Sequence, residues 1–96
     1  MMNVYRIYDD AWEDIVGPEQ LRGFTADQMR DVLCTNTDEE VVELVYDFVS
    51  KKNRDLVIEI LGKFRTDETV INDVSERLLI DLLKIKAFDV EMLNIY

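Results

Sequence analysis

Acidic side chains spaced three and four residues apart are the groups in this sequence that could do chemistry. Two groups stand out: Asp9, Asp10, Glu13 and Asp14, and Glu40, Glu43 and Asp47. Helical residues four apart lie about 5–6 Å from each other, so each group would form a ladder of carboxylates on a helix. That spacing is comparable to the spacing of phosphates along a nucleic-acid strand. The ladders predict a docking surface for a basic partner protein; the alternative is a solvated face opposite the core.

Aromatic side chains accompany both acidic groups. Tyr5, Tyr8 and Trp12 stand beside the first group, and Tyr46 neighbours Asp47. Tyrosine and tryptophan are frequent anchors of protein interfaces. We expect Tyr8 and Trp12 to be core residues, because their positions continue the apolar face of a helix, and we expect Tyr5 and Tyr46 to be exposed at its edges. The candidate partner-binding residues are therefore the acids of both groups, together with Tyr5 and Tyr46.

The same acids allow a different interpretation, a magnesium-dependent enzyme. All-α nucleotide pyrophosphatases bind Mg²⁺ through Glu-x-x-Glu and Glu-x-x-Asp pairs on neighbouring helices. Glu40-x-x-Glu43 supplies one such pair, but Asp73-x-x-Glu76 has the reversed order. A hard cation needs carboxylates that converge on one point, whereas the pattern directs these acids towards solvent. No glycine-rich phosphate loop accompanies them. We therefore expect no catalytic residues, no metal ligands and no cofactor.

The composition excludes several further kinds of site. The 96 residues include no histidine and one cysteine, which rules out histidine-dependent catalysis, a disulfide framework and a Cys/His zinc site. The formal net charge of −10 argues against nucleic acid or an anionic membrane as the direct partner. Residues 1–47 carry twelve acids and three bases, while residues 48–96 carry nine and eight. The lone Cys34 suits a cytoplasmic protein, and we expect it to be packed.

The elements that would position these residues are predicted to be helices. Residues 1–96 are expected to form a single all-α domain, a compact bundle of about five helices joined by short loops. Residues 4–16 show the first amphipathic pattern, closed by Gly17-Pro18. The alternative for this segment is a short N-terminal strand over residues 3–8, because short apolar runs are ambiguous.

Capping signals divide the rest of the chain. Residues 18–23 are expected to form one helical turn. A capping box at Thr25 then predicts a helix to about Cys34, and a second capping box at Thr37 predicts a helix to about Val49. Asn53 can cap a helix over residues 54–64, and Thr66 can cap a long helix that ends near Lys86. Residues 89–96 are expected to form a short docked helix or an ordered tail.

These features favour a non-catalytic protein that binds another macromolecule. The leading hypothesis is an acidic inhibitor, immunity or anti-defence protein, of the kind made by phages and mobile elements. It would cover a basic surface on a nuclease, polymerase or other nucleic-acid-binding protein. The alternative is an adaptor or homo-oligomeric module, such as a homodimer, that uses apolar residues of the C-terminal helix and tail. A magnesium-dependent nucleotide pyrophosphatase is the third hypothesis.

Overall fold

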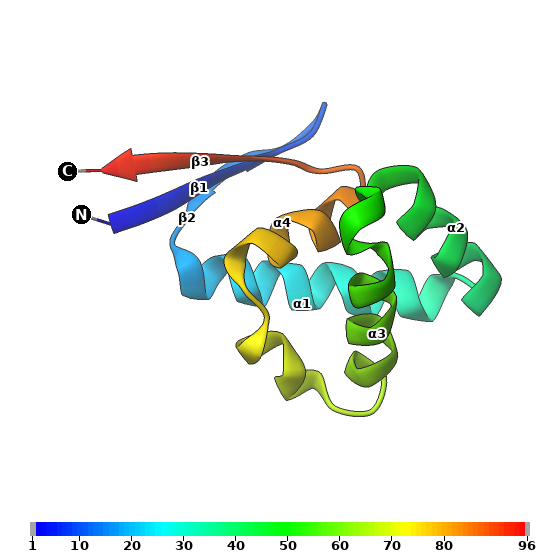
Figure 1. Cartoon of the computed structure of the whole chain (residues 1–96). Coiled ribbons are helices and arrows are strands. Elements are labelled where there is room, and N and C mark those ends of the chain that lie inside the picture. Colours follow the sequence, from blue (N-terminus) through cyan, green and yellow to red (C-terminus); the bar gives the residue numbers. More distant parts are fainter. Residues whose placement is uncertain (1, 96) are drawn as a thin grey trace.

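A computed structural model describes residues 2–95 and the side-chain surroundings of residues 3–93. The chain is mostly helical but carries a three-stranded antiparallel sheet, so the prediction of an all-α fold is wrong in that respect. The elements are β1 (Met2–Tyr8), β2 (Glu13–Val16), α1 (Pro18–Thr35), α2 (Asp38–Phe48), the 3₁₀ helix η1 (Lys51–Asn53), α3 (Arg54–Phe64), the 3₁₀ helix η2 (Glu68–Asp73), α4 (Glu76–Ile85) and β3 (Asp89–Ile95). Figure 1 shows the sheet along one side of the helices, with both termini at the same end.

The N-terminal segment is a β-hairpin: β1 confirms the alternative of a short strand over residues 3–8, the second strand β2 was not predicted, and the helix predicted over residues 4–16 is wrong. Burial along β1 alternates: Tyr5 and Ile7 are buried, and Arg6 between them is half-buried. This two-residue period is that of a strand with one face on the core. β1 lies between β2 and β3, in the register Tyr5↔Val16 and Tyr5↔Met92. The C-terminal segment expected as a helix or tail is thus the third strand, with residue 96 outside the described residues.

The helices over residues 37–49 and 54–64 are confirmed by α2 and α3, and the other boundaries differ. α1 is continuous from Pro18 to Thr35, and the Thr25 hydroxyl donates to the Leu21 carbonyl (2.7 Å) inside this helix instead of capping a new one. The predicted long last helix is divided into η2 and α4. Ser75, not Thr66, caps α4 and accepts a hydrogen bond from the Leu78 N–H (3.4 Å). The side chain of Asn53 makes no cap bond to α3.

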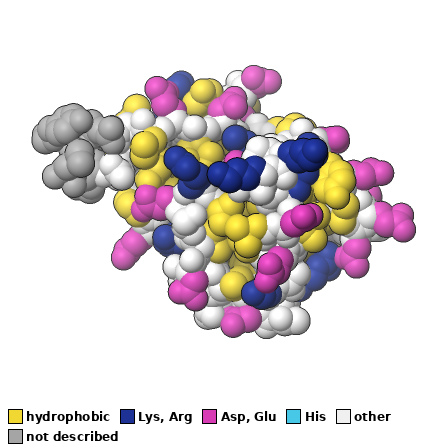
Figure 2. All heavy atoms as spheres, viewed as in Figure 1, with side chains coloured by type: hydrophobic (Ala, Val, Ile, Leu, Met, Phe, Trp, Pro, Cys, Tyr) yellow, Lys and Arg dark blue, Asp and Glu magenta, His cyan; other side chains and the backbone are white. Residues whose placement is uncertain are grey.

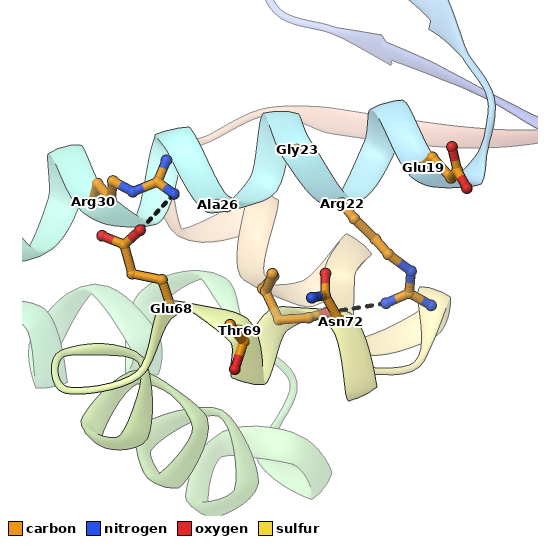
Figure 3. A pocket seen from close by; sticks show the side chains of 9 residues that line it. Glu19, Arg22, Gly23, Ala26, Arg30, Glu68, Thr69 and Asn72 are labelled. Carbon is orange, nitrogen blue, oxygen red and sulfur yellow. Dashed lines mark hydrogen bonds and ion pairs between the residues drawn. The ribbon is translucent and has the colours of Figure 1, made fainter.

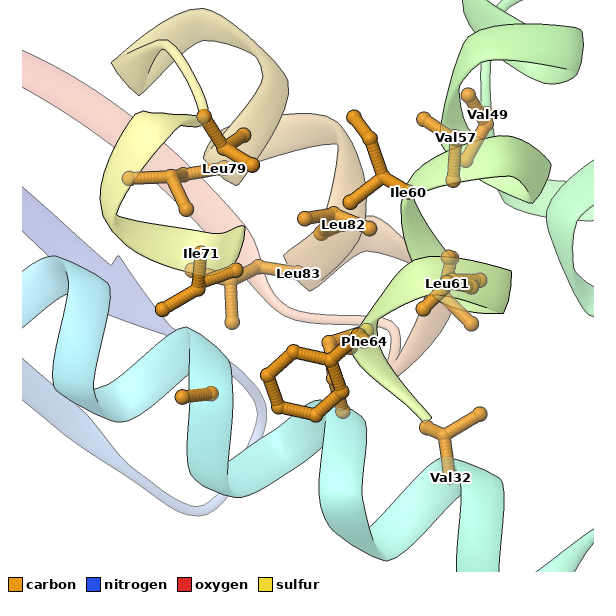
Figure 4. Close-up of a cluster of buried hydrophobic side chains, with 14 of the residues drawn as sticks. Val32, Val49, Val57, Ile60, Leu61, Phe64, Ile71, Leu79, Leu82 and Leu83 are labelled. Atoms are coloured by element: carbon orange, nitrogen blue, oxygen red, sulfur yellow. The ribbon is translucent and has the colours of Figure 1, made fainter. Parts of the chain in front are cut away.

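The core lies where α4 packs against α1, α2, α3 and the sheet. α4 supplies Leu79, Leu82 and Leu83, none of which has measurable exposure, and Figure 4 shows them among side chains of α1, α3 and η2. Asp81 on the same helix is also buried, and its carboxylate accepts a hydrogen bond from the Asn53 amide (2.5 Å) and pairs with Lys84 (3.3 Å). The buried charge is therefore compensated, as burial of a carboxylate requires.

Two helix-interior glycines give a stability prediction. A Cβ built on Gly23 in α1 or on Gly62 in α3 meets no other group within 4 Å. Replacing either glycine with alanine should raise the free energy of unfolding by about 0.5–1 kcal/mol, because glycine loses more backbone entropy in a helix. Urea denaturation measures this change. A loss of stability in either variant would contradict the open space seen around these positions.

Among the described residues, no helix is long and apolar enough to cross a membrane.

Candidate functional site

The first acidic group does not form a helical ladder. Asp9 closes the four-residue loop between β1 and β2: its carboxylate accepts the N–H groups of Ala11 (2.8 Å) and Trp12 (2.7 Å), and its own N–H donates to the Trp12 carbonyl (2.8 Å). Glu13 and Asp14 follow as neighbouring residues of β2, so their side chains leave opposite faces of the sheet. The four acids predicted to share one face are therefore separated.

Glu13 is also neutralised within the protein. The guanidinium of Arg6, in the middle strand, bridges Glu13 on β2 (3.0 Å) and Glu91 on β3 (3.3 Å), and it lies 4.0 Å from the centre of the Tyr8 ring. The hydrogen bond from Arg6 lowers the pKa of the Glu13 carboxyl. This network joins the three strands on the outer face of the sheet, and it makes Glu13 a structural residue.

Tyr5 is buried, which corrects the prediction that it is exposed. Its side chain is 1% exposed, and its hydroxyl donates to the Glu76 carboxylate at the start of α4. Burial, and then the bond to Glu76, raise the pKa of Tyr5 to about 12. The prediction was wrong because position 5 lies on the edge of a helical face but on the inner face of a strand. Tyr5 is therefore unable to contact a partner from the folded state.

Trp12 lies at the surface rather than in the core, again against expectation. It is 38% exposed and stacks on Phe24 of α1, with ring centres 4.9 Å apart, while Phe88 contacts both rings edge-on. Such aromatic pairs add to the stabilisation from burial. The cluster holds the hairpin loop against α1 and the beginning of β3. Sequence periodicity missed it, because Phe24 and Phe88 come from segments far apart in the chain.

The second acidic group forms the predicted helical ladder. Glu40, Glu43 and Asp47 are all exposed on α2, and Glu39 extends the row. Glu40 also completes the predicted capping box: its carboxylate accepts the Thr37 N–H (3.0 Å), and the Thr37 hydroxyl accepts the Glu40 N–H (3.3 Å). The Thr37 N–H lowers the pKa of Glu40. α2 itself contains no basic residue, and Arg65 from outside the helix pairs with Asp38 in its first turn (2.6 Å), not with the acids of the row.

Apolar side chains accompany the ladder on α2. Val42 is 38% exposed and Tyr46 is 50% exposed, which confirms the expected exposure of Tyr46. Arg54 lies beneath this tyrosine: its guanidinium is 5.1 Å from the ring centre and donates to the Tyr46 carbonyl (2.9 Å). In Figure 2, acidic side chains and a hydrophobic patch lie together on the side of the molecule where Figure 1 places α2. We call Glu39, Val42, Glu43, Tyr46 and Asp47 the α2 face.

The two acidic regions meet at Phe88 without forming one surface. Phe88 contacts the hairpin through Trp12, and it also lines a shallow hollow of about 300 Å³ together with Asp47 at the end of α2. Lys84 lines the same hollow and introduces a positive charge between the regions. The sequence left open whether the two groups form one surface; in the structure Phe88 and Lys84 lie between them, and the α2 face is the continuous acidic region.

The chain matches no protein-family model, no curated protein and no solved structure.

A cleft of about 600 Å³ between α1 and η2 was not predicted, and side chains within the protein bridge it (Figure 3). Arg22 reaches across it and donates to the carbonyls of Ile71 (3.0 Å) and Val74, which end η2. Arg30 bridges Asp27 (2.6 Å) and Glu68 (2.9 Å) at the other end of the cleft. Both arginines thus fasten the 3₁₀ helix to α1. A sequence signal existed, since they are two of the three bases before residue 48.

The acids considered for an Mg²⁺ site lie on different elements. Glu40 and Glu43 are on α2, Asp73 ends η2, and Glu76 begins α4, where it accepts the Tyr5 hydroxyl. Within the part of the chain that the structure describes, no three carboxylate, cysteine or histidine side chains come together as metal ligands would. Cys34, expected to be packed, is exposed at the end of α1.

Proposed function

We propose that this chain is a non-catalytic binding protein whose α2 face covers a basic, nucleic-acid-binding surface of a partner protein. Inhibitor, immunity and anti-defence proteins act in this way. The observation that carries the proposal is the composition of the α2 face: three exposed carboxylates, from Glu39, Glu43 and Asp47, surround two exposed apolar side chains, Val42 and Tyr46.

Electrostatics supports a basic partner. Glu39 and Glu43, and likewise Glu43 and Asp47, are four residues apart, so their carboxylates repel each other by a few tenths of a kcal/mol per pair. A row of lysine or arginine side chains would relieve that repulsion. Complementary charge also accelerates association and selects the partner. The spacing of the carboxylates, about 5–6 Å, lets them occupy positions that phosphates occupy in a nucleic-acid groove.

The exposed apolar side chains of the α2 face, Val42 and Tyr46, support a protein partner rather than dissolved counter-ions. Partly exposed tyrosines that are held in place are typical binding hot spots, because little side-chain entropy is lost on binding. The guanidinium of Arg54, 5.1 Å from the centre of the Tyr46 ring, packs against this side chain and restricts it before any partner binds. The revised binding surface excludes the buried Tyr5, the loop-closing Asp9 and the Arg6-paired Glu13.

A charge-reversal variant tests the proposal. The probe is the heparin-retained fraction of a lysate from the source organism, passed over the immobilised protein and eluted with a salt gradient. We expect the wild-type chain to retain a specific basic protein that elutes as salt rises, because screening weakens exposed charge pairs. Glu39→Lys, Glu43→Lys and Asp47→Lys, combined, should weaken this retention at least about tenfold.

A second triple variant provides the control. Asp10→Lys, Asp14→Lys and Asp73→Lys change three exposed acids outside α2 and alter the net charge by the same amount. Retention should survive these changes. If both triple variants lose the partner equally, bulk charge rather than the α2 face is responsible, and the proposal fails. It also fails if nothing from the heparin-retained fraction binds the wild-type chain. Helical circular dichroism of both variants confirms that each is folded.

A further inference from the structure

The C-terminal strand leaves one edge of the sheet open. β3 pairs with β1 along its whole length, from Met2↔Ile95 to Tyr8↔Asp89, and the strand order β2-β1-β3 places it at the edge. No other strand of the described chain pairs with its second side. In Figure 1 the ends of β1 and β3 that carry the termini extend beyond the helices. Alternate backbone N–H and C=O groups of β3 therefore face outwards, ready to pair.

The two edges of the sheet differ in how they are protected. β2 has only four residues and carries Glu13 and Asp14, and a short, charged edge strand resists pairing. β3 has seven residues and contains no proline or lysine. Its two acids, Asp89 and Glu91, lie in its first half, and Met92 at its centre has 55% of its surface exposed. Natural proteins rarely leave a long edge strand of this kind uncovered.

We propose that two copies of this chain pair through β3, antiparallel and centred on Met92, so that their two three-stranded sheets become one. The strand is self-complementary in this arrangement. A two-fold axis at Met92 places Glu91 of each copy opposite Leu93 of the other, so no two like charges face each other directly. Arg6 already compensates Glu91 within each copy at 3.3 Å. The anionic α2 lies at the other end of the molecule from the termini (Figure 1).

The salt response of this dimer distinguishes it from the binding of a basic partner. Each copy carries a formal net charge of −10, so the copies repel each other and added salt should strengthen pairing. Binding of a basic protein through the α2 face should weaken with salt. The dimer does not rest on that proposed function, because it uses a different surface and a different kind of partner.

Sedimentation analysis of the purified chain from about 1 μM to about 1 mM, at low and high salt, tests the dimer. We expect the dimer fraction of the wild-type chain to rise with both concentration and salt. Met92→Lys should weaken dimerisation at least about tenfold, although the added positive charge reduces the overall repulsion. Ile15→Lys is the matched control: Ile15 is also 55% exposed, lies on the other edge strand and receives the same new charge. It should leave dimerisation unchanged.

Hydrogen exchange gives a second readout that does not depend on a variant. In concentrated samples, the β3 amides that face away from β1 should exchange more slowly than in dilute samples, in an alternating pattern along the strand. A wild-type chain that stays monomeric over the whole range of concentration and salt overturns the proposal. Equal weakening by Met92→Lys and Ile15→Lys, or an amide pattern independent of concentration, overturns it as well.

Discussion

Leu82→Ala should lower the free energy of unfolding by about 3 kcal/mol, within the range of about 2–5 kcal/mol found for buried leucines. Leu82 has no exposed surface and lies in the centre of α4, where the helices and the sheet meet. Removing three carbon atoms there loses transfer free energy and leaves a cavity that the surrounding elements fill only in part. Urea denaturation followed by circular dichroism measures the loss as a lower midpoint at an unchanged slope.

Leu56→Ala serves as the matched control for this change. Leu56 is a leucine on α3 with 44% of its surface exposed, so its truncation removes little buried area. We expect a loss below about 1 kcal/mol at this position. Similar losses at Leu82 and Leu56 would show that the folded chain in solution does not have the core described here.

Alkaline pH should destabilise the fold through Tyr5. Burial, followed by the bond to Glu76, raises the pKa of this tyrosine from 10.0 to about 12, so the folded state favours the protonated hydroxyl. The contribution of Tyr5 is complete below about pH 10 and is lost as the pH rises towards about 12. Two pKa units correspond to about 2–3 kcal/mol. Unfolding free energies measured over this pH range should fall by an amount of that order.

Tyr5→Phe isolates the contribution of the hydroxyl. The variant keeps the buried ring and leaves Glu76 without its donor, so it should be less stable than the wild type at neutral pH. The difference between the two proteins should shrink between about pH 10 and 12, because only the wild type loses the favourable protonated hydroxyl. Tyr46→Phe, at an exposed tyrosine, should retain the alkaline loss. A pH-independent difference between wild type and Tyr5→Phe would rule out this role for Tyr5.

The two proposed interactions use different surfaces and different forces: charge attraction at the α2 face, and strand pairing at the β3 edge. The α2 face carries uncompensated negative charge and a tyrosine restricted by Arg54, which suits a basic protein. The β3 edge offers backbone groups and Met92, which suit a second copy of the same strand. Because salt should weaken the first interaction and strengthen the second, one titration with salt separates them.

The predictions that succeeded were those whose physical basis is local. The capping box of Thr37 and Glu40 defines the start of α2, because both of its hydrogen bonds form within four residues. Once that helix is fixed, its 3.6-residue period decides which acids stand outside, so the exposure of Glu43, Tyr46 and Asp47 also followed. The prediction at Thr25 failed because the same kind of box can lie inside a longer helix, where the hydroxyl donates to the preceding turn.

The predictions that failed concern contacts between distant parts of the chain. The spacing of Val4, Ile7, Tyr8 and Ile15 is compatible with one helix face or with two strands, and only pairing decides between them. That pairing joins β1 to β3. Arg6 of β1 lies opposite Glu91 of β3, and these two residues are 85 positions apart in the sequence, so no local sequence pattern can predict that they pair. Once β1 became a strand, Tyr5 turned inwards, Trp12 moved to a loop beside Phe24 and Phe88, and the first acidic group was divided.

The sequence by itself therefore determined the helices α2 and α3, the concentration of negative charge before residue 48 and the anionic row on α2. Tertiary structure alone decided the sheet, the burial of Tyr5, the pairing of Glu13 with Arg6 and the open edge of β3. The physical reason is the range of the hydrogen bonds. A helix satisfies its backbone groups within one turn, so its sequence suffices, whereas a strand needs a partner that the rest of the fold must deliver.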